Sequence, residues 1–251
     1  MRIVDGMPYQ RPESEDALIS DLRALFDSSP IHLAPTWDYQ MIAYLRRQTL
    51  SRLLYWDQLY RQIVDVPGAI VEMGVMYGAT LSTLTSLRGI YEPYNYERKL
   101  YGFDTFSGFP VVTPEDGGHW DVGDHATPSG YEDHLRALLS VQEGFSPLSE
   151  IEKSKLIVGD VSETLPQWLA ENPGQMVAMA IFDMDIYQPT RDALEAIEPR
   201  LTKGSIVVFD ELTCEAFPGE FRAFQEVVGS KNVRLRRSPL LATCGWYVVG
   251  E

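Results

Sequence analysis

The sequence has few of the features that mark secreted, zinc-stabilised or membrane-spanning proteins. Cys214 and Cys244 are the only cysteines in 251 residues, which excludes a disulfide framework and a structural zinc site built on four cysteines. No stretch approaches the roughly 18 consecutive apolar residues of a membrane span. Residues 1–30 also lack the apolar core of a signal peptide. These absences predict a cytoplasmic protein in a reducing compartment.

Basic residues are also scarce. Lys and Arg total 21 against 36 Asp and Glu, which gives a formal net charge of −15 and argues against a nucleic-acid-binding surface. Because 45% of the residues are hydrophobic, the acidity does not indicate disorder. The length suits one substantial core with an appendage.

Two phosphate-binding patterns are missing. The chain has no G-x-x-x-x-G-K-[ST] loop, which disfavours a nucleoside triphosphate as the cofactor, and no G-x-G-x-x-G fingerprint, which disfavours NAD. In their place the sequence has E-x-G-x-x-x-G, with Glu72, Gly74 and Gly78. Its glycines would let the backbone approach a ligand closely.

The N-terminal quarter has helical periodicity. Residues 15–26 and 39–60 repeat apolar side chains at helical spacing, so residues 1–64 are predicted to form a helical extension that caps the acceptor. Aromatic side chains at this spacing belong more often to a core than to an acceptor pocket, and both interpretations stay open. The residues concerned are Trp37, Tyr39, Tyr44, Tyr55, Trp56 and Tyr60.

From residue 65 to 251 short apolar segments alternate with amphipathic ones, the pattern of a parallel sheet covered by helices. Strands are predicted at 69–73, 99–103, 155–158, 176–182 and 205–209, with a closing pair at 233–235 and 246–249 joined by a loop that contains Pro239 and Gly245. Helices are predicted at 80–90, 192–201 and 221–228, the second one stopped by Gly204. The fold class is therefore α/β, a doubly wound and mostly parallel seven-stranded sheet of Rossmann-like type.

Acidic residues lie at the ends of five of these strands or directly after them. They are Glu72, Asp104, Asp160, Asp183, and Asp210 with Glu211. Each one alone has a structural explanation, because Asp is a common helix cap. Together they predict a shared functional edge, since ligands of open α/β sheets bind beyond the carboxyl ends of the strands. Asp104 occupies the usual place of a ribose-binding acid.

Asp183, Asp210 and Glu211 predict a divalent cation site. Adjacent strands that end in carboxylates bring hard oxygen ligands together, which favours Mg²⁺ over zinc and leaves Mn²⁺ possible. Asp185 is expected instead to cap a helix that starts near Pro189. An acidic edge that would repel phosphates is compatible with the cationic sulfonium of S-adenosylmethionine.

Four segments carry a resemblance to a known family. They are VEMGVMYGAT (71–80), YGFDTFSGFP (101–110), GDVSETLP (159–166) and FDMDIYQPTRDALEAIEPRLTKGSIVVFDEL (182–212). They resemble the macrocin O-methyltransferases, class I S-adenosylmethionine-dependent enzymes that methylate sugar hydroxyls in natural-product biosynthesis. The resemblance implies a class I methyltransferase fold, S-adenosylmethionine and Mg²⁺ as cofactors, and a homo-oligomer that pairs through its N-terminal elements.

The resemblance also implies roles for individual residues. The cofactor site comprises Glu72, Gly74, Gly78, Asp104, Asp160 and Asp183, in which the two glycines match the methionine-tail loop, Asp104 the nucleoside-contacting acid and Asp160 the position near adenine. The metal ligands are Asp183, Asp210 and Glu211, although the family commonly has two Asp at the last pair.

The general base implied by the resemblance is a His in the long segment between the second and third strands. His125 matches best, His119 is the alternative, and His134 lies in a helical pattern that predicts a surface position. Residues 111–130, rich in Gly and Pro, are predicted to form a mobile lid. Catechol-type relatives carry a Lys where this chain has Ile186, which argues against a catechol mechanism.

The sequence therefore predicts a Mg²⁺-dependent O-methyltransferase that acts on a sugar hydroxyl of a glycosylated natural product or its precursor. The partners are a small-molecule acceptor and further copies of the chain, with no nucleic acid or membrane. The alternatives are a methyltransferase for a phenolic or other non-sugar hydroxyl, and a non-catalytic metal- or nucleoside-binding protein of the same fold.

Overall fold

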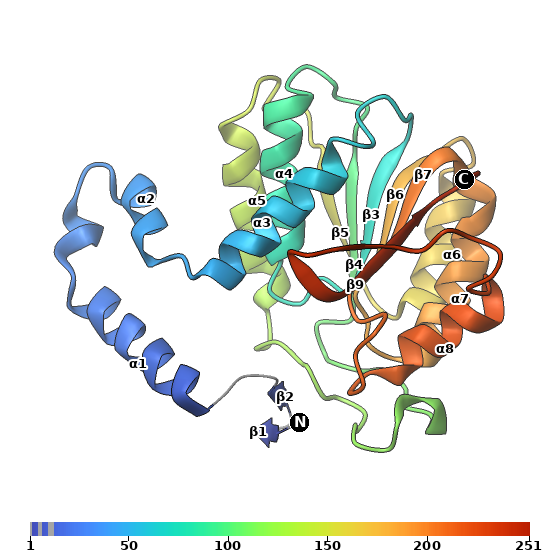
Figure 1. The fold of residues 1–251 in the computed structure, drawn as a ribbon. Coiled ribbons are helices and arrows are strands. Elements are labelled where there is room, and N and C mark those ends of the chain that lie inside the picture. The colour runs from blue at the N-terminus through green and yellow to red at the C-terminus, as the bar shows by residue number, and fades with distance from the viewer. Residues whose placement is uncertain (1, 5–6, 10–12) are drawn as a thin grey trace. The chain divides into compact units, whose positions relative to one another are not determined.

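A computed structural model describes residues 2–4, 7–9 and 13–251 of the chain (Figure 1). The chain divides into two compact units, residues 1–54 and residues 55–251, and each is described by itself. This division lies ten residues before the predicted boundary at 64/65, inside a helix. The predicted role of the first unit as an acceptor cap stays a prediction.

The first unit consists of short elements. They are β1 (Arg2–Val4), β2 (Met7–Tyr9), α1 (Glu13–Ser28), η1 (Pro30–Leu33), α2 (Trp37–Gln40), η2 (Met41–Tyr44) and the first half of α3 (Arg47–Tyr60). β1 and β2 pair in antiparallel fashion. The helical periodicity over 39–60 is divided among α2, η2 and α3, because Leu45 has an extended backbone with ψ 123° and separates η2 from α3.

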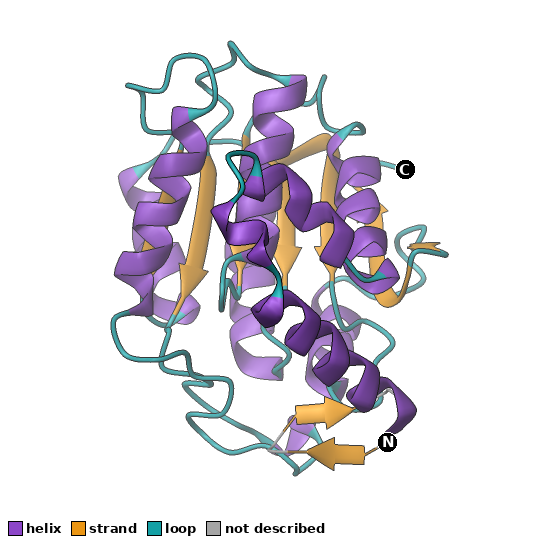
Figure 2. Ribbon diagram, turned by 90° about the vertical axis from the view of Figure 1, so that its left-hand side faces the viewer, coloured by secondary structure: helices purple, strands orange, loops and turns teal. Residues whose placement is uncertain are grey.

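The second unit contains a seven-stranded sheet with the order β5-β4-β3-β6-β7-β9-β8 (Figure 2). The strands are β3 (Ala69–Met73), β4 (Leu100–Asp104), β5 (Ser154–Val158), β6 (Val177–Phe182), β7 (Leu201–Phe209), β8 (Arg236–Ser238) and β9 (Leu241–Val248). β3 to β7 are parallel, and β9 is antiparallel to both β7 and β8. The predicted fold class is confirmed.

Helices cover both faces of the sheet. α4 (Ala79–Tyr91), α5 (Tyr131–Gly144) and the end of α3 lie on one face, and α6 (Val161–Glu171), α7 (Tyr187–Ile197) and α8 (Pro218–Val227) lie on the other. Each face packs its own hydrophobic cluster, so the central strands β3 and β6 are buried throughout. Alternate residues of β3 serve the two faces, with Ile70 on one and Val71 on the other.

The aromatic residues of the N-terminal quarter separate into two groups. Tyr55, Trp56 and Tyr60 belong to the core cluster of the second unit, as the core interpretation predicts. Trp37 and Tyr39, with Tyr44, lie in the first unit, where an acceptor-pocket role stays a prediction.

Three predicted boundaries are wrong. α7 ends at Ile197 and is followed by η4 (Glu198–Arg200), so Gly204 does not stop a helix. Gly204 lies inside β7, where its N–H donates to the carbonyl of Val249 at 2.9 Å. The last strands are displaced too, because β8 starts at Arg236 and Gly245 lies within β9 rather than in the loop.

Among the described residues, no helix combines the length and apolar character needed to cross a bilayer. The cytoplasmic location stays a prediction from composition.

Candidate functional site

The residues that follow the central strands are still held by the sheet. Gly74 N–H donates to the carbonyl of Phe103 at 2.9 Å, Asp183 N–H to Met73 at 2.9 Å, and Asp210 N–H to Phe182 at 3.0 Å. The strand order reverses between β3 and β6, which is where open α/β sheets bind ligands. The structure therefore brings Gly74, Asp183 and Asp210 to one edge.

The glycine loop packs tightly at this reversal. Gly74 has φ +89°, and a Cβ there would stand 1.8 Å from the carbonyl oxygen of Asp183. Gly78 has φ +79° at the N-cap of α4, and a Cβ there would stand 2.3 Å from the side chain of Leu135. Both positions need glycine, because a side chain would push apart elements that meet at the edge.

Asp104 ties this loop to the next one. Its Oδ2 accepts hydrogen bonds from the N–H groups of Val75 at 2.6 Å and Met76 at 2.7 Å, and its Oδ1 accepts from Phe106 at 2.6 Å. Met76 and Phe106 have positive φ angles of 49° and 54°, which are uncommon outside glycine and cluster at functional sites. A carboxylate offers about four acceptor positions, so three backbone donors do not saturate Asp104.

The other two acids predicted to bind the cofactor also have structural positions. Asp160 is the N-cap of α6, where its Oδ1 accepts from Ser162 N–H at 2.9 Å. Glu72 is 1% exposed within β3 and lies between Gly102 of β4 and Ile181 of β6 in the strand register. Their predicted roles at the cofactor stay predictions.

The end of β7 carries a concentration of negative charge. Asp210 is 4% exposed, and the thiol of Cys244 donates to its Oδ1 at 3.1 Å. Glu211 donates its backbone N–H to Oε1 of Glu220 at 2.9 Å. Burial and the nearby carboxylates of Glu211, Asp185 and Asp210 raise the pKa of Glu220 well above its ordinary value.

Glu220 is a site residue that the sequence did not single out. It is completely buried in the first turn of α8, and its Oε2 has no hydrogen-bond partner within the described part of the chain. A buried carboxylate oxygen without a partner is costly. The only signal in the sequence was that Phe217-Pro218-Gly219-Glu220 directly precedes the predicted helix at 221–228.

The donor set at this corner fits a hard cation in its chemistry. Carboxylate oxygens are the ligands that Mg²⁺ and Mn²⁺ prefer, and the carboxylates of Glu211, Asp185 and Asp210 lie near enough to Glu220 to raise its pKa. In residues 2–4, 7–9 and 13–251, however, no three His, Cys, Asp or Glu side chains are arranged closely enough to hold an ion. The predicted ligation by Asp183, Asp210 and Glu211 is therefore a proposal.

Both cysteines lie beside Asp210 and Glu211, and neither forms a disulfide. Cys214 N–H donates to the carbonyl of Glu211 at 2.9 Å. Burial and the nearby Glu211 raise the pKa of Cys214 to about 11, so its side chain is a neutral thiol at pH 7.

His125 lies in an aromatic enclosure. Its ring stacks on Phe109 with centroids 4.9 Å apart and contacts the edges of Trp120 at 5.3 Å and Phe217 at 5.8 Å. Its Nδ1 is 3.8 Å from Oδ2 of Asp185, and its Nε2 is buried without a hydrogen-bond partner among the described residues. Burial lowers the pKa of His125 below 6.5, although the charge of Asp124 opposes the shift.

The other two histidines of the segment between β4 and β5 lie elsewhere. His119 is exposed. His134 is exposed on α5, as the helical pattern predicts. Of the two candidate bases, the structure thus places His125 close to an acid that follows β6.

The expectation that Asp185 caps a helix is wrong. α7 begins at Tyr187, its N-cap position is Ile186, and Asp185 has a left-handed backbone with φ +67°. The cap comes instead from Asp116, whose Oδ1 accepts from Tyr187 N–H at 2.6 Å. This pair is 71 residues apart in the chain, so no local pattern could have shown it.

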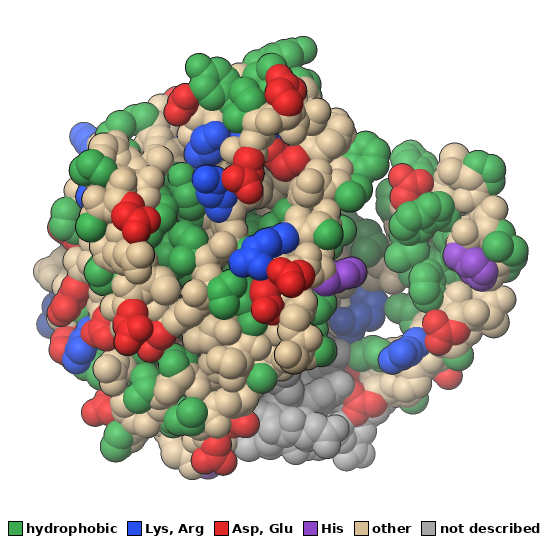
Figure 3. Space-filling model, turned by 180° about the vertical axis from the view of Figure 1, so that it is seen from behind, with side chains coloured by type: hydrophobic (Ala, Val, Ile, Leu, Met, Phe, Trp, Pro, Cys, Tyr) green, Lys and Arg blue, Asp and Glu red, His purple; other side chains and the backbone are tan. Residues whose placement is uncertain are grey.

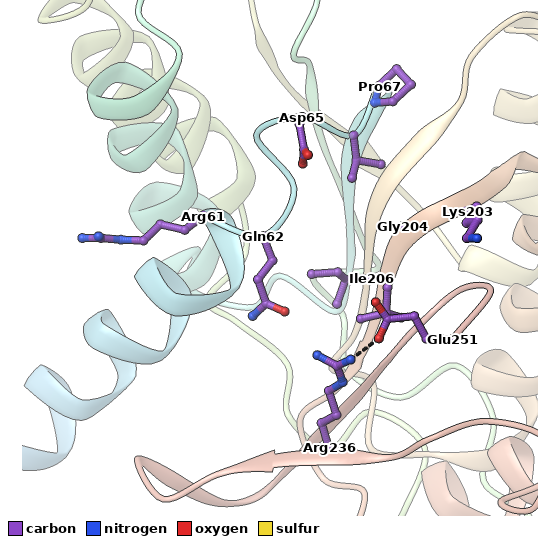
Figure 4. A pocket seen from close by; sticks show the side chains of 11 residues that line it. Arg61, Gln62, Asp65, Pro67, Lys203, Gly204, Ile206, Arg236 and Glu251 are labelled. Atoms are coloured by element: carbon purple, nitrogen blue, oxygen red, sulfur yellow. Dashed lines mark hydrogen bonds and ion pairs between the residues drawn. The ribbon is translucent and has the colours of Figure 1, made fainter.

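A separate hollow of about 490 Å³ lies at the opposite edge of the sheet, where β3 and β7 begin (Figure 4). Arg61, Asp65, Lys203, Arg236 and Glu251 are among its lining residues, and Arg236 forms an ion pair with Glu251. None of the predicted site residues lines this hollow. On the face of the second unit shown in Figure 3, acidic side chains are spread among neutral and basic ones.

Comparisons with known proteins match this architecture. The family model of the macrocin O-methyltransferases (TylF) matches residues 21–233. The crystal structure of CalS11, a calicheamicin methyltransferase, is 40% identical, covers 100% of both chains and has a TM-score of 0.92. An apo structure described as CalS11, TDP-rhamnose 3'-O-methyltransferase, is 39% identical, covers 97% of both chains and has a TM-score of 0.85.

A curated relative is the mycinamicin III 3''-O-methyltransferase of Micromonospora griseorubida, which is 28% identical over 185 residues and 70% of this chain. The match spans 66% of that relative, slightly less than two thirds of its length. The family match extends over most of the chain and includes all the strand ends described above. The chain therefore belongs to the macrocin O-methyltransferase family.

Proposed function

We propose that this protein is an S-adenosylmethionine- and divalent-cation-dependent O-methyltransferase for a sugar hydroxyl, carried by a natural product or by the activated sugar that precedes it. The observation that supports this function most is the edge where the loop at Gly74 meets Asp104 and Asp183. The sugar acceptor follows from the relatives, which are described as acting on TDP-rhamnose and on mycinamicin III.

In this proposal the glycine loop and the acids beside it bind the cofactor. Gly74 and Gly78 let the loop pack closely against Asp183 and Leu135, and in this conformation the loop would bind the methionine portion. Asp104 and Asp160 would face the nucleoside, with Glu72 buried within β3. S-adenosylmethionine supplies a methyl group on a cationic sulfonium, to which an acidic edge is electrostatically suited. The product that leaves is S-adenosylhomocysteine.

Asp183, Asp210 and Glu211 would hold the cation, Mg²⁺ or Mn²⁺. The cation would supply Lewis acidity that lowers the pKa of the acceptor hydroxyl. Glu220 supports this proposal, because its Oε2 is buried without a hydrogen-bond partner among the described residues and the carboxylates of Glu211, Asp185 and Asp210 raise its pKa.

His125 would act as the general base. Its Nε2 takes the proton of the acceptor hydroxyl while the oxygen forms a bond to the methyl carbon and the bond from that carbon to sulfur breaks. Burial favours the neutral imidazole that this step needs. The aromatic rings around His125 exclude water, so water does not compete with the acceptor hydroxyl for the base.

The test is mass spectrometry of products after incubation with methyl-labelled S-adenosylmethionine, Mg²⁺ and a panel of acceptors. The panel contains TDP-rhamnose, macrolide glycosides and a simple phenol. We expect one labelled methyl ether on a sugar, lost on addition of a chelator and in Asp183→Asn. Glu195→Gln, which removes an exposed acid of α7, should retain full activity as the matched control.

Two results would overturn the proposal. Methylation of the phenol alone would establish a non-sugar acceptor. Failure to bind S-adenosylhomocysteine at millimolar concentration in calorimetry would exclude a transferase and favour a non-catalytic protein of this fold. An unchanged rate in chelator would remove the cation from the proposal while leaving methyl transfer in place.

A further inference from the structure

Residues 105–130, between β4 and α5, are joined to the rest of the second unit by a buried carboxylate. Asp116 is 1% exposed and lies at the end of η3 (Pro114–Asp116). Its Oδ2 accepts from Thr113 N–H at 2.7 Å and from the Thr113 hydroxyl at 3.0 Å. Its Oδ1 accepts from Tyr187 N–H at 2.6 Å. One side chain thus connects this segment to the first turn of α7.

The contact with α8 is equally close. A Cβ on Gly219 would stand 2.2 Å from Oδ1 of Asp116, so only glycine leaves room for the carboxylate at this point. Trp120 adds a second attachment, because its indole N–H donates to the carbonyl of Ala216 at 3.0 Å. The Trp120 ring also stacks on Phe217 at 4.6 Å and 8°.

These attachments determine where His125 lies. His125 belongs to the same segment, has φ +65°, and is enclosed by Phe109 and Trp120 from the segment and by Phe217 from the start of α8. The acid that it approaches, Asp185, lies two residues before the N–H that Asp116 caps. Detachment of the segment would therefore separate His125 from Phe217 and from Asp185 together.

We infer that Asp116 is a positioning residue, which holds His125 against Asp185 and away from water by joining residues 105–130 to the N-terminal turn of α7. The inference rests on the proposed role of His125 as the base. A carboxylate is suited to this place because the N-terminus of a helix favours negative charge and offers unpaired N–H donors.

The groups that face His125 give a distinctive pH signature. Asp124 on its own segment and Asp185 after β6 are the acids near it, and its other neighbours are the neutral rings of Phe109, Trp120 and Phe217. Release of the segment would hydrate the imidazole and restore its ordinary titration. The acidic limb of the rate profile would then move upward in pH.

The experiment compares Asp116→Ala and Asp116→Asn with the wild type, using Glu115→Gln as the charge-matched control from the adjacent position. The readouts are kcat, the KM for S-adenosylmethionine, the pH dependence of kcat and chymotrypsin cleavage within residues 105–130. Phe109 and Trp120 are buried chymotrypsin sites in this segment, so cleavage there reports its release.

For Asp116→Ala we expect a fall in kcat of at least about tenfold, a KM changed by less than about threefold, an upward shift of the acidic limb and at least tenfold faster cleavage. Asp116→Asn keeps one acceptor oxygen and should lie between this variant and the wild type. If Asp116→Ala does not fold, Asp116→Asn carries the test alone.

The role of Asp116 alone would be overturned if the acidic limb and the cleavage rate stayed unchanged in the Asp116 variants while His125→Gln was inactive. Full activity in His125→Gln would overturn the proposed base, and with it the positioning role. The two failures are therefore distinguished by one additional variant.

Discussion

His125 is the single residue on which the proposed chemistry depends most. We expect His125→Gln to lower kcat by about 10²- to 10⁴-fold, the usual contribution of a general base. Because burial lowers the pKa of His125 below 6.5, the wild type should keep its neutral base at pH 7. Its rate should fall only as the pH drops below that pKa. A pH–rate profile measures both features.

The control for this variant is His119→Gln, which changes an exposed His of the same segment and should leave kcat unchanged. The opposite result, with His119→Gln inactive and His125→Gln active, would transfer the base to the alternative His.

Glu220 gives a second prediction at this scale. Glu220→Gln keeps an acceptor for Glu211 N–H but removes a buried ionisable carboxyl group next to other carboxylates. Without added cation the variant should be more stable than the wild type, because the raised pKa of Glu220 means that wild-type stability decreases as pH rises through that pKa. About 1 kcal/mol corresponds to a rise in Tm of roughly 2–4 °C for a chain of this size.

The same variant should gain less stability from Mg²⁺ than the wild type. The measurement is thermal unfolding without Mg²⁺ and with Mg²⁺ at roughly 100 times its Kd for the wild type. Glu215→Gln, an exposed acid of the same loop, is the control. A lower Tm for Glu220→Gln together with an unchanged Mg²⁺ effect would show that the carboxylate serves only as the hydrogen-bond acceptor of Glu211 N–H.

At the scale of elements, the loop after β3 and the loop after β4 depend on Asp104. Asp104→Asn replaces one acceptor oxygen with an NH2 group, so either Val75 and Met76 or Phe106 lose the acceptor of their N–H groups. Hydrogen bonds to a charged group contribute about 1.5–3 kcal/mol. We therefore expect affinity for S-adenosylhomocysteine to fall at least about tenfold in calorimetry.

Asp121→Asn is the control for this prediction, since Asp121 is exposed in the following segment. Unaltered affinity in Asp104→Asn would mean that the loop keeps its conformation without the carboxylate and that Asp104 does not contact the nucleoside.

The sequence predicted the elements of the sheet well where the apolar runs are short and bounded. β3 is predicted residue for residue, and β4 to β7 within a few residues. Errors arose where tertiary contacts outweigh local pattern. Gly204 resembles a helix stop but pairs with Val249, and Gly245 resembles a loop residue but pairs with Phe209 in the register of β7 and β9.

The edge of the site was predictable because parallel strands deliver their following residues to one side of a sheet. Asp116 and Glu220 were not predictable, because their partners Tyr187 and Glu211 are 71 and 9 residues away and lie across turns of unknown geometry. The segment predicted as a mobile lid is attached through Asp116 and Trp120 in this structure, and its mobility stays a prediction.

At the scale of the whole molecule, the two units differ in their packing. All three hydrophobic clusters of the described residues belong to the second unit. Amphipathic helices in water need an apolar partner. We expect the protein to form a homo-oligomer, with a mass in sedimentation equilibrium that is a multiple of 28.4 kDa.

The control for this measurement is the same run at high salt, since a chain with a net charge of −15 repels its copies more strongly at low ionic strength. A species of 28.4 kDa at all protein and salt concentrations would contradict the prediction.

The close approach of Gly219 to Asp116 has a consequence for how this family can diverge. The two positions lie in different elements yet share one small volume, so evolution cannot enlarge the first without giving up the carboxylate of the second. A side chain at position 219 would also stand 2.5 Å from the backbone nitrogen of Tyr187, so it would require a shift of the start of α7 as well as a change at position 116. We therefore expect positions 116 and 219 to be replaced together, and with them the way in which residues 105–130 are attached, even where the strand-end acids are identical.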